Sequence, residues 1–379
     1  MQDSQKTNPL ARPGQKSGGA NVRFPCESCG ALQTYAPGTD LLHCEYCGHD
    51  TPISPRQVGP IRELPLNEAL QRLDHSLKTQ DRFTIQCENC AAEFSFDENN
   101  HAGKCPFCGT PVVVKPGKSR RILPKSLIPF NITGKEAEER FNQWLSGLWL
   151  APSRLKQAGR ATGKLTGVYI PYWTYDSDTR TTYTGERGDA YQVPQRVMVT
   201  VNGRRTASTR MVTKVRWTRV TGRVSRFFDD VLVGASRTLP RTITDKLAPW
   251  RLEELTSFSE EYLSGFQSEL YQVHLDEGFN TALRTMDNMI RGDVARDIGG
   301  DFQRIRHIDT SHSRITYKHI LLPIYSSAFS FGRKTYRFVI NGQTGKVQGE
   351  RPYSPWKIGL TVFLALLCLG GLALLQGNL

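Results

Sequence analysis

Residues 26–47 read CESCGALQTYAPGTDLLHCEYC, and this stretch contains two CxxC pairs separated by fourteen residues. The same pattern recurs further along the chain, where residues 87–108 read CENCAAEFSFDENNHAGKCPFC. A shift of 61 positions superposes all four cysteines of the first stretch on those of the second. The chain therefore contains an internal repeat of a cysteine-rich unit.

The spacing of these cysteines is typical of zinc ribbons. Four thiolates at tetrahedral corners form a structural zinc site, and a CxxC pair on a tight turn directs two of them at one ion. Glycine follows the second cysteine in three of the four pairs, at Gly30, Gly48 and Gly109, where it tolerates the positive φ of such a turn. Each unit is too small to fold on its own core, so metal binding of roughly 10–16 kcal/mol would supply the folding energy. We therefore predict two zinc ions, and the predicted ligands are Cys26, Cys29, Cys44, Cys47, Cys87, Cys90, Cys105 and Cys108.

Two other roles for paired cysteines remain as alternatives. Disulfide-bonded modules require an oxidising compartment, but residues 1–20 lack the apolar segment of a signal peptide. Thioredoxin-type redox chemistry requires one CxxC that opens a helix after a strand, rather than four pairs in two matched units. His43, His49 and His101 lie near the cysteines, and we interpret them as bystanders because four thiolates already complete each shell.

The sequence after the second unit has strand-like segments. Residues 165–185 and 196–220 alternate apolar and polar side chains and are rich in Val, Thr and Tyr, a pattern that predicts strands. Asn202-Gly203 is typical of a hairpin turn. Residues 313–350 return to the same pattern.

Helical periodicity appears in two places in this region. Residues 134–149 form an amphipathic pattern, and Thr133 with Glu136 fits a capping box at its start. Residues 240–292 are also predicted to be mostly helical.

The C-terminal stretch Ile358–Leu375 carries no charge across eighteen positions. As a helix it would be about 27 Å long, close to the roughly 30 Å of a bilayer core. Trp356 and Lys357 stand where an interfacial anchor belongs. A buried core helix is the alternative, which the uniform apolarity disfavours. We predict one transmembrane helix at 356–376, and the basic residues before it place the bulk of the chain in the cytoplasm, at a bacterial inner membrane.

The predicted fold class is α+β, with two small four-cysteine zinc ribbons, a mixed α+β body and one C-terminal transmembrane helix. The predicted divisions are a disordered lead-in (1–20), zinc ribbon 1 (21–55), a linker with a short helix (56–82), zinc ribbon 2 (83–114), the α+β body (120–355) and the transmembrane helix (356–376).

The charge balance indicates a polyanionic neighbour. The chain has 49 Lys and Arg against 36 Asp and Glu, a formal net charge of +13. Residues 190–228 contain nine basic residues and no Asp or Glu. This segment is a solvated strand face, a surface for anionic lipid headgroups, or a nucleic-acid site. Lipid is favoured over nucleic acid, because a tethered domain would lie beside the membrane surface. The aromatic string at 169–175 is interpreted as a core strand rather than a binding ledge.

The sequence contains no recognisable catalytic motif. Gly117-Lys118-Ser119 resembles the end of a phosphate loop, but Val112 stands where its first glycine is required. Asp176 and its acidic neighbours have no evident base or metal partner in the sequence. We therefore predict that the protein is not an enzyme.

Five strings in the body, together with the CxxC units, resemble a known family. They are YIPYWTYD (169–176), YTGERGD (183–189), FDDVLVGAS (228–236), LLPIY (321–325) and VINGQTGKVQGERP (339–352). Over residues 24–360 the chain is similar to bacterial membrane-anchored double zinc-ribbon proteins, often catalogued under primosomal helicase-like or transcription-factor-IIB-type zinc-ribbon names. The resemblance implies no helicase activity. It implies that the eight paired cysteines bind zinc, and that the partner is an SPFH-domain or phage-shock-protein-A-like protein.

The predicted function is that of a non-catalytic, membrane-anchored zinc-ribbon adaptor, which recruits a cytoplasmic protein partner to the inner membrane. The alternative is a membrane-tethered nucleic-acid-binding protein.

Overall fold

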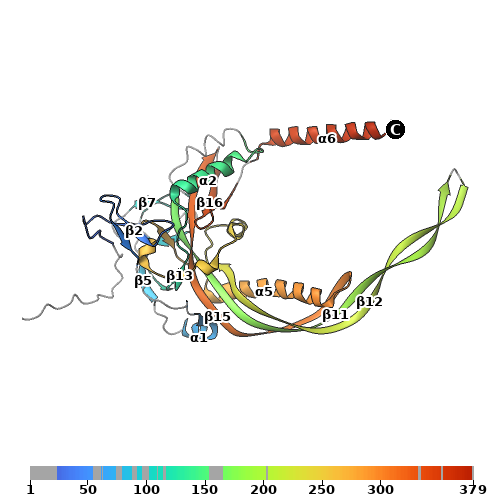
Figure 1. Cartoon of the computed structure of the whole chain (residues 1–379), viewed down its shortest axis with the longest axis horizontal. Helices are drawn as coiled ribbons and strands as arrows, with labels where there is room; N and C mark the ends of the chain where they lie inside the picture. Colours follow the sequence, from blue (N-terminus) through green and yellow to red (C-terminus); the bar gives the residue numbers. More distant parts are fainter. Residues whose placement is uncertain are drawn as a thin grey trace, which may run out of the picture.

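One large β-sheet lies at the centre of the chain, and helices and the cysteine-rich units surround it (Figure 1). This computed structural model describes residues 24–53, 61, 63–73, 79–87, 92–95, 102–108, 110–113, 117–152, 165–201, 204–331, 334–350 and 353–377. Within those residues, twelve strands form the large sheet, and two smaller sheets belong to the cysteine-rich units. The body is therefore mixed α+β.

Long antiparallel strands form the middle of the large sheet. They are β11 (Thr166–Val201), β12 (Arg204–Gly234), β15 (Phe302–Phe331) and β16 (Lys334–Asn341). β11 lies between β12 and β15 and is antiparallel to both. The strands predicted from the alternating pattern are present, and they extend well beyond the predicted bounds. The predicted turn at 202–203 lies outside the described residues.

Short strands complete the sheet around this centre. They are β4 (Leu64–Pro65), β5 (Thr79–Gln86), β6 (Glu93–Ser95), β9 (Gly117–Ile122), β10 (Ser126–Leu127), β13 (Thr256–Ser257), β14 (Gln267–Glu269) and β17 (Val347–Gly349). Strands β10 and β14 run parallel to their long neighbours, β15 and β11 respectively. Strand β5 precedes the first CxxC pair of the second unit and β6 lies between its two pairs, so this unit is joined directly to the large sheet.

Helix α5 (Leu275–Ile298) covers one face of the long strands (Figure 1). It buries an apolar residue at every fourth position, which are Ala282, Met286, Ile290, Val294 and Ile298. Near the start of the helix, Trp173 Nε1 donates to the Val273 carbonyl at 2.9 Å, and the Tyr175 hydroxyl donates to the Leu275 carbonyl at 2.7 Å. Both aromatic side chains are fully buried. The aromatic string is therefore core, as predicted.

Helix α2 (Gly134–Ser146) begins at the predicted capping box. The Glu136 N–H donates to Thr133 Oγ1 at 3.2 Å, and the Thr133 N–H donates to the Glu136 carboxylate at 2.7 Å. Phe141 is buried and stacks on Phe338 with ring centroids 3.9 Å apart. The short helix predicted in the linker is α1 (Leu66–Leu73).

The prediction of helix across 240–292 is correct only from Leu275 onward. The part before it has only short pieces, which are α4 (Arg241–Thr244), three 3-10 turns η1 (Asp245–Leu247), η2 (Leu252–Glu254) and η3 (Glu260–Leu263), and strands β13 and β14. Pro249 has no backbone N–H, and Gly265 has a φ of +85°, so neither continues a helix. Backbone groups here bond to other segments instead, as when the Phe258 N–H donates to the Lys125 carbonyl at 2.9 Å.

Strands β11 and β12 continue past the rest of the sheet as a two-stranded arm (Figure 1). The last residue of β11 that pairs with β15 is Gly188, opposite Phe302. From Asp189 to Val201, β11 pairs only with β12 among the described strands. The arm therefore projects without a covering layer.

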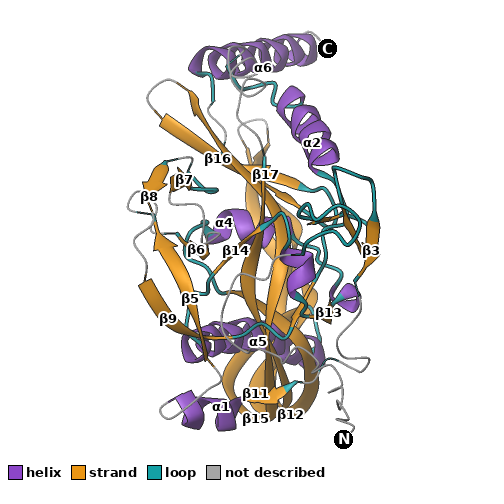
Figure 2. Cartoon of the chain, turned by 90° about the vertical axis from the view of Figure 1, so that its left-hand side faces the viewer, coloured by secondary structure: helices purple, strands orange, loops and turns teal. Residues whose placement is uncertain are grey.

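The chain ends in helix α6 (Pro355–Gly377), which points away from the body (Figures 1 and 2). Among the helices that the structure describes, none is both long and apolar enough to span a bilayer. A crossing helix needs about 20 apolar residues. Lys357 instead occupies the first turn and donates to the Trp149 and Ala151 carbonyls, and the described side chains end at Gly370. The predicted transmembrane helix at 356–376 is therefore wrong.

Candidate metal centres

The first cysteine-rich unit folds as two tight turns beside a small sheet of β1 (Thr34–Tyr35), β2 (Leu41–His43) and β3 (Asp50–Pro52). In the first turn the Gly30 N–H donates to the Cys26 carbonyl at 2.8 Å, and in the second the Gly48 N–H donates to the Cys44 carbonyl at 2.9 Å. The two glycines have φ of +76° and +73°, a region that a residue with a Cβ avoids. This confirms why glycine follows these pairs.

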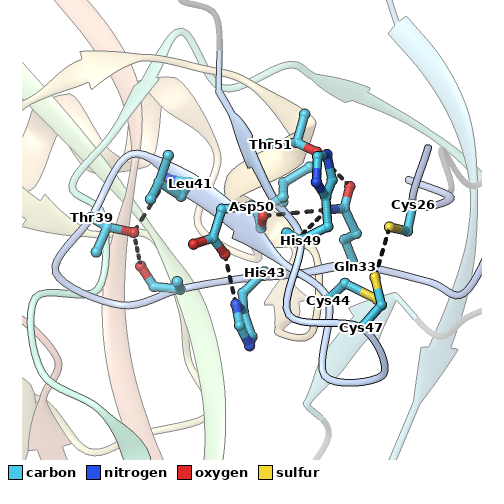
Figure 3. A network of polar contacts seen from close by, with 12 residues as sticks. Cys26, Gln33, Thr39, Leu41, His43, Cys44, Cys47, His49, Asp50 and Thr51 are labelled. Carbon is cyan, nitrogen blue, oxygen red and sulfur yellow. Dashed lines mark hydrogen bonds and ion pairs between the residues drawn. The ribbon is translucent and has the colours of Figure 1, made fainter. Parts of the chain in front are cut away.

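The two turns bring four sulfur atoms together. Cys26, Cys29, Cys44 and Cys47 have Sγ atoms that all lie within 4.8 Å of one another. Cys26 Sγ lies 3.5 Å from Cys47 Sγ (Figure 3). Cys29 Sγ lies 3.5 Å from Cys44 Sγ. A tetrahedron with metal–sulfur bonds of about 2.3 Å has edges of about 3.8 Å, whereas a disulfide is about 2.05 Å long. The described cysteines are free thiols, so this cluster fits a metal ion.

A polar network holds the second turn in place (Figure 3). His43 Nδ1 lies 2.6 Å from the Asp50 carboxylate. Gln33 donates to the His49 carbonyl at 3.2 Å and accepts from the Thr51 hydroxyl at 3.0 Å. His43 is therefore committed to a carboxylate rather than to the sulfur cluster, as expected of a bystander. His101 lies outside the described residues.

The second unit repeats the backbone pattern of the first. The N–H of the first cysteine in each pair donates to the carbonyl five residues later; the four bonds join Cys26 to Ala31, Cys44 to His49, Cys87 to Ala92 and Cys105 to Thr110, at 2.7–3.0 Å. Cys87, Cys105 and Cys108 form a cluster within 4.8 Å, and Cys87 Sγ lies 3.6 Å from Cys108 Sγ. Cys90 and Gly109 lie outside the described residues. Three of the four predicted ligands are thus placed together.

The two clusters differ in exposure. Cys87, Cys105 and Cys108 are all buried, and Phe94 and Phe107 beside them are fully buried in the core of the body. In the first cluster Cys26 and Cys44 are buried, but Cys29 and Cys47 are exposed. Figure 2 shows β3 of the first unit and the hairpin β7 (Ala102–Lys104) and β8 (Pro111–Val113) of the second at opposite sides of the chain. One cluster is therefore internal and the other lies at the surface.

The thiols of the first cluster influence one another's protonation. The backbone N–H of Cys47 is the main group that lowers the pKa of the Cys44 thiol, to about 7. For Cys47, a backbone N–H at His49 lowers the pKa, but the neighbouring sulfur of Cys29 and burial raise it more, to about 12. The first thiolate in the cluster therefore forms readily, and its negative charge opposes deprotonation of the next thiol. A cation among the sulfur atoms would remove that repulsion, because metal ligands must be deprotonated.

An acidic cluster elsewhere in the body was not predicted from the sequence. Glu63, Asp176 and Asp229 have carboxylate oxygens within 4.8 Å of one another. Lys318, only 7% exposed, places its ammonium 2.7 Å from Asp230 and 3.2 Å from Glu63. The ammonium already supplies the positive charge, so we interpret this cluster as a buried ion-pair network.

Protons in this network are shared between two carboxyl groups. Burial is the main cause that raises the pKa of Asp176 to about 7, and its hydrogen bond with Glu63 adds to the shift. The pKa of Glu63 is lowered, because hydrogen bonds from Asp176, Thr316 and Lys318 outweigh burial. The one available signal was Lys318 itself, a charge inside the apolar string at 317–325, which indicates a buried partner.

Comparison with known proteins places the chain beside an uncharacterised relative. No family model and no solved structure matches it. Its two N-terminal cysteine clusters are consistent with zinc ribbons. The chain is a distant homologue of the uncharacterized protein YdjG of Bacillus subtilis (strain 168), to which it is 26% identical over 357 residues that cover 89% of this chain and 92% of that protein.

Proposed function

We propose that the chain is a non-catalytic zinc-ribbon adaptor that binds a protein partner through its first cysteine-rich unit. The proposal assigns one zinc ion to each unit, with Cys90 as the fourth ligand of the second. Zinc, when bound, holds four thiolates at tetrahedral corners and supplies folding energy to a unit that has little core of its own. The second unit, whose described cysteines are buried, then has a structural role, and the first unit is left for recognition.

The observation that carries this proposal is the exposure of side chains on the first unit. Tyr46, between the cysteines of the second turn, is 89% exposed, and Leu32, just after the first turn, is 55% exposed. Tyrosine is enriched at the centres of protein interfaces, where one ring supplies a large contact area and a hydroxyl. Both residues are close in sequence to the clustered cysteines, so a bound ion would fix the backbone that carries them.

The first unit is also fixed on the body, which suits a docking surface. The Tyr35 N–H donates to the Ser264 carbonyl at 3.0 Å, and the Gly38 N–H donates to the Phe130 carbonyl at 2.7 Å. Tyr35, Leu42 and Ile53 are buried in the adjoining core. A pre-ordered surface loses less conformational entropy when a partner binds to it.

The family resemblance supplies the class of partner. We propose an SPFH-domain or phage-shock-protein-A-like protein, the class that accompanies similar zinc-ribbon proteins. The predicted site of action, at the inner face of the bacterial membrane, stays a prediction.

Site-specific crosslinking tests the docking surface. Tyr46→p-benzoylphenylalanine places a photoreactive group on the first unit, and the matched control is the same replacement at Tyr353, which is 57% exposed outside it. The full chain would be irradiated in cells and its crosslinked products identified by mass spectrometry. We expect a protein of the stated class at position 46 and not at 353. Identical products at both positions, or none of that class at 46, would contradict the proposal.

A further inference from the structure

The two-stranded arm presents a strongly basic surface. We define the basic ribbon as residues 190–201 of β11, their partners 204–215 of β12, and Arg216, which pairs with Asp189 just outside the ribbon. The ribbon contains no Asp or Glu. Its basic side chains that the structure describes are all exposed, and they are Arg196, Arg210, Lys214 and Arg216.

The basic ribbon is not covered by the rest of the described chain. None of its described side chains is buried, and an isolated two-stranded ribbon is at best marginally stable in water. Its open edges could in principle pair with a second copy of the same strand. The like charges along β12 oppose such pairing, as lysine and arginine do on natural edge strands. Charge complementarity therefore favours an anionic occupant.

The arrangement of the charges distinguishes between anionic surfaces. Side chains alternate between the two faces of a strand, so Arg210, Lys214 and Arg216 share one face of the ribbon. Arg196 pairs with Thr209, which places it on the opposite face. A flat lipid surface would contact one face and leave the other unneutralised. A groove with phosphates along both walls contacts both faces of a ribbon that enters it edge-on.

The major groove of B-form DNA is such a groove, and it admits a two-stranded β-ribbon. Arginine and lysine on the ribbon would contact phosphates on either side. The major groove of duplex RNA is too narrow for protein side chains to enter. We propose that the basic ribbon binds double-stranded DNA by entering its major groove, a role separate from protein binding at the first cysteine-rich unit.

Salt dependence measures this contact directly. With four phosphate contacts, the slope of log K against log salt would be about −3.6, and the affinity of the zinc-loaded full chain for a fluorescent 20-base-pair duplex would fall about 100-fold between 50 and 200 mM salt. The triple variant Arg196→Gln, Arg210→Gln and Lys214→Gln removes three contacts. We expect its affinity to fall about tenfold or more and its slope to decrease by about 3.

A matched control separates the ribbon from overall charge. The variant Lys125→Gln, Lys246→Gln and Arg284→Gln removes the same charge from exposed positions on the body, and we expect it to bind DNA as the unchanged chain does. An equal loss of DNA affinity in both triple variants would overturn the assignment of DNA binding to the basic ribbon. So would undetectable DNA binding at 50 mM salt, equal binding of a duplex RNA, or ribbon-dependent binding to phosphatidylserine vesicles without DNA binding.

Crosslinking gives a second readout that does not depend on weakening the ribbon. Met211→p-benzoylphenylalanine, on the ribbon, should crosslink to the duplex, because Met211 is 53% exposed. The control is the same replacement at Met289 on α5, which is 44% exposed. A crosslink to the duplex at 211 and not at 289 supports the proposal. Equal crosslinking at the two positions, or no crosslink at 211, refutes it.

Discussion

The different burial of the two cysteine clusters makes a direct prediction about their loss. Cys29→Ser removes an exposed predicted ligand from the first unit, and Cys87→Ser removes a fully buried predicted ligand from the second. Each variant should retain one zinc ion per chain instead of two. The stability effects should differ, because only the second cluster is continuous with the core of the body.

The difference in stability between the two variants depends on how much buried structure each cysteine cluster holds in place. When the second unit opens, Phe94 and Phe107 lose complete burial, which costs about 1.5–3 kcal/mol for each side chain. The first unit keeps its buried Tyr35 and its hydrogen bonds to the body, so the cost of Cys29→Ser should be about 1 kcal/mol. At about 2 °C per kcal/mol for a chain of this size, Cys87→Ser should melt about 4–10 °C below Cys29→Ser.

Metal content and thermal unfolding would be measured on the same samples of the full chain. Zinc would be quantified by mass spectrometry after desalting, and unfolding followed by circular dichroism. A chelator should also remove one ion from the unchanged chain faster than the other, and Cys29→Ser should abolish the fast phase. If Cys29→Ser melts at or below Cys87→Ser, or if both variants still hold two ions, the reasoning from burial is refuted.

Three further predictions concern the body. Because the pKa of Asp176 is raised from 3.8 to about 7, the folded state binds more protons than the unfolded state between these values, and stability falls as pH rises through them. Relative to Asp176→Asn, the free energy of unfolding of the unchanged chain should fall by about 2 kcal/mol between pH 4 and 7. The shift of Asp176 alone would give about 4 kcal/mol, and the lowered pKa of Glu63 offsets part of it. If urea titrations give the same pH dependence of stability for both chains, this prediction is wrong. Lys318→Met leaves Glu63 and Asp230 without their ammonium and should lower the free energy of unfolding by about 3–5 kcal/mol at pH 7. If Lys318→Met destabilises the chain less than Asp230→Asn does, the lysine does not hold the network together. Trp173→Phe leaves the Val273 carbonyl unpaired and should cost about 3 kcal/mol, seen as a melting temperature lower by about 6 °C, and an unchanged melting temperature would rule out the hydrogen bond as a contributor.

The features that were predictable from the sequence are those set by local geometry. The clustered cysteines lie in turns of a few residues, so their spacing and the following glycine were sufficient to predict that they come together. The capping box at Thr133 and Glu136 spans four residues and was equally visible. The ion-pair network joins Glu63, Asp176 and Lys318 from distant segments, and no local pattern indicates which strands become neighbours.

The length of strand β11 was not predictable from the sequence for a related reason. Strand β11 contains Pro171 and Pro194, and proline within an alternating run argues against a continuous strand. Pro194 is tolerated because the ribbon has open edges, where a missing N–H breaks no further ladder. Nothing in the local sequence reports whether a neighbouring strand is present on that side, so the arm became evident only from the pairing.

The two proposed surfaces differ in how they are held before a partner binds. The basic ribbon contains no acidic residue and none of its described side chains is buried, and its like charges oppose pairing with a second copy of itself. The first cysteine-rich unit, in contrast, is buried at its base and exposed at its turns, so its rigidity would come from the bound ion and from the body together. A surface that is ordered before binding favours a specific protein contact, whereas a projecting basic ribbon favours a regular polyanion. The two surfaces should therefore respond differently to salt, with DNA binding lost as salt rises and protein binding at Tyr46 largely retained.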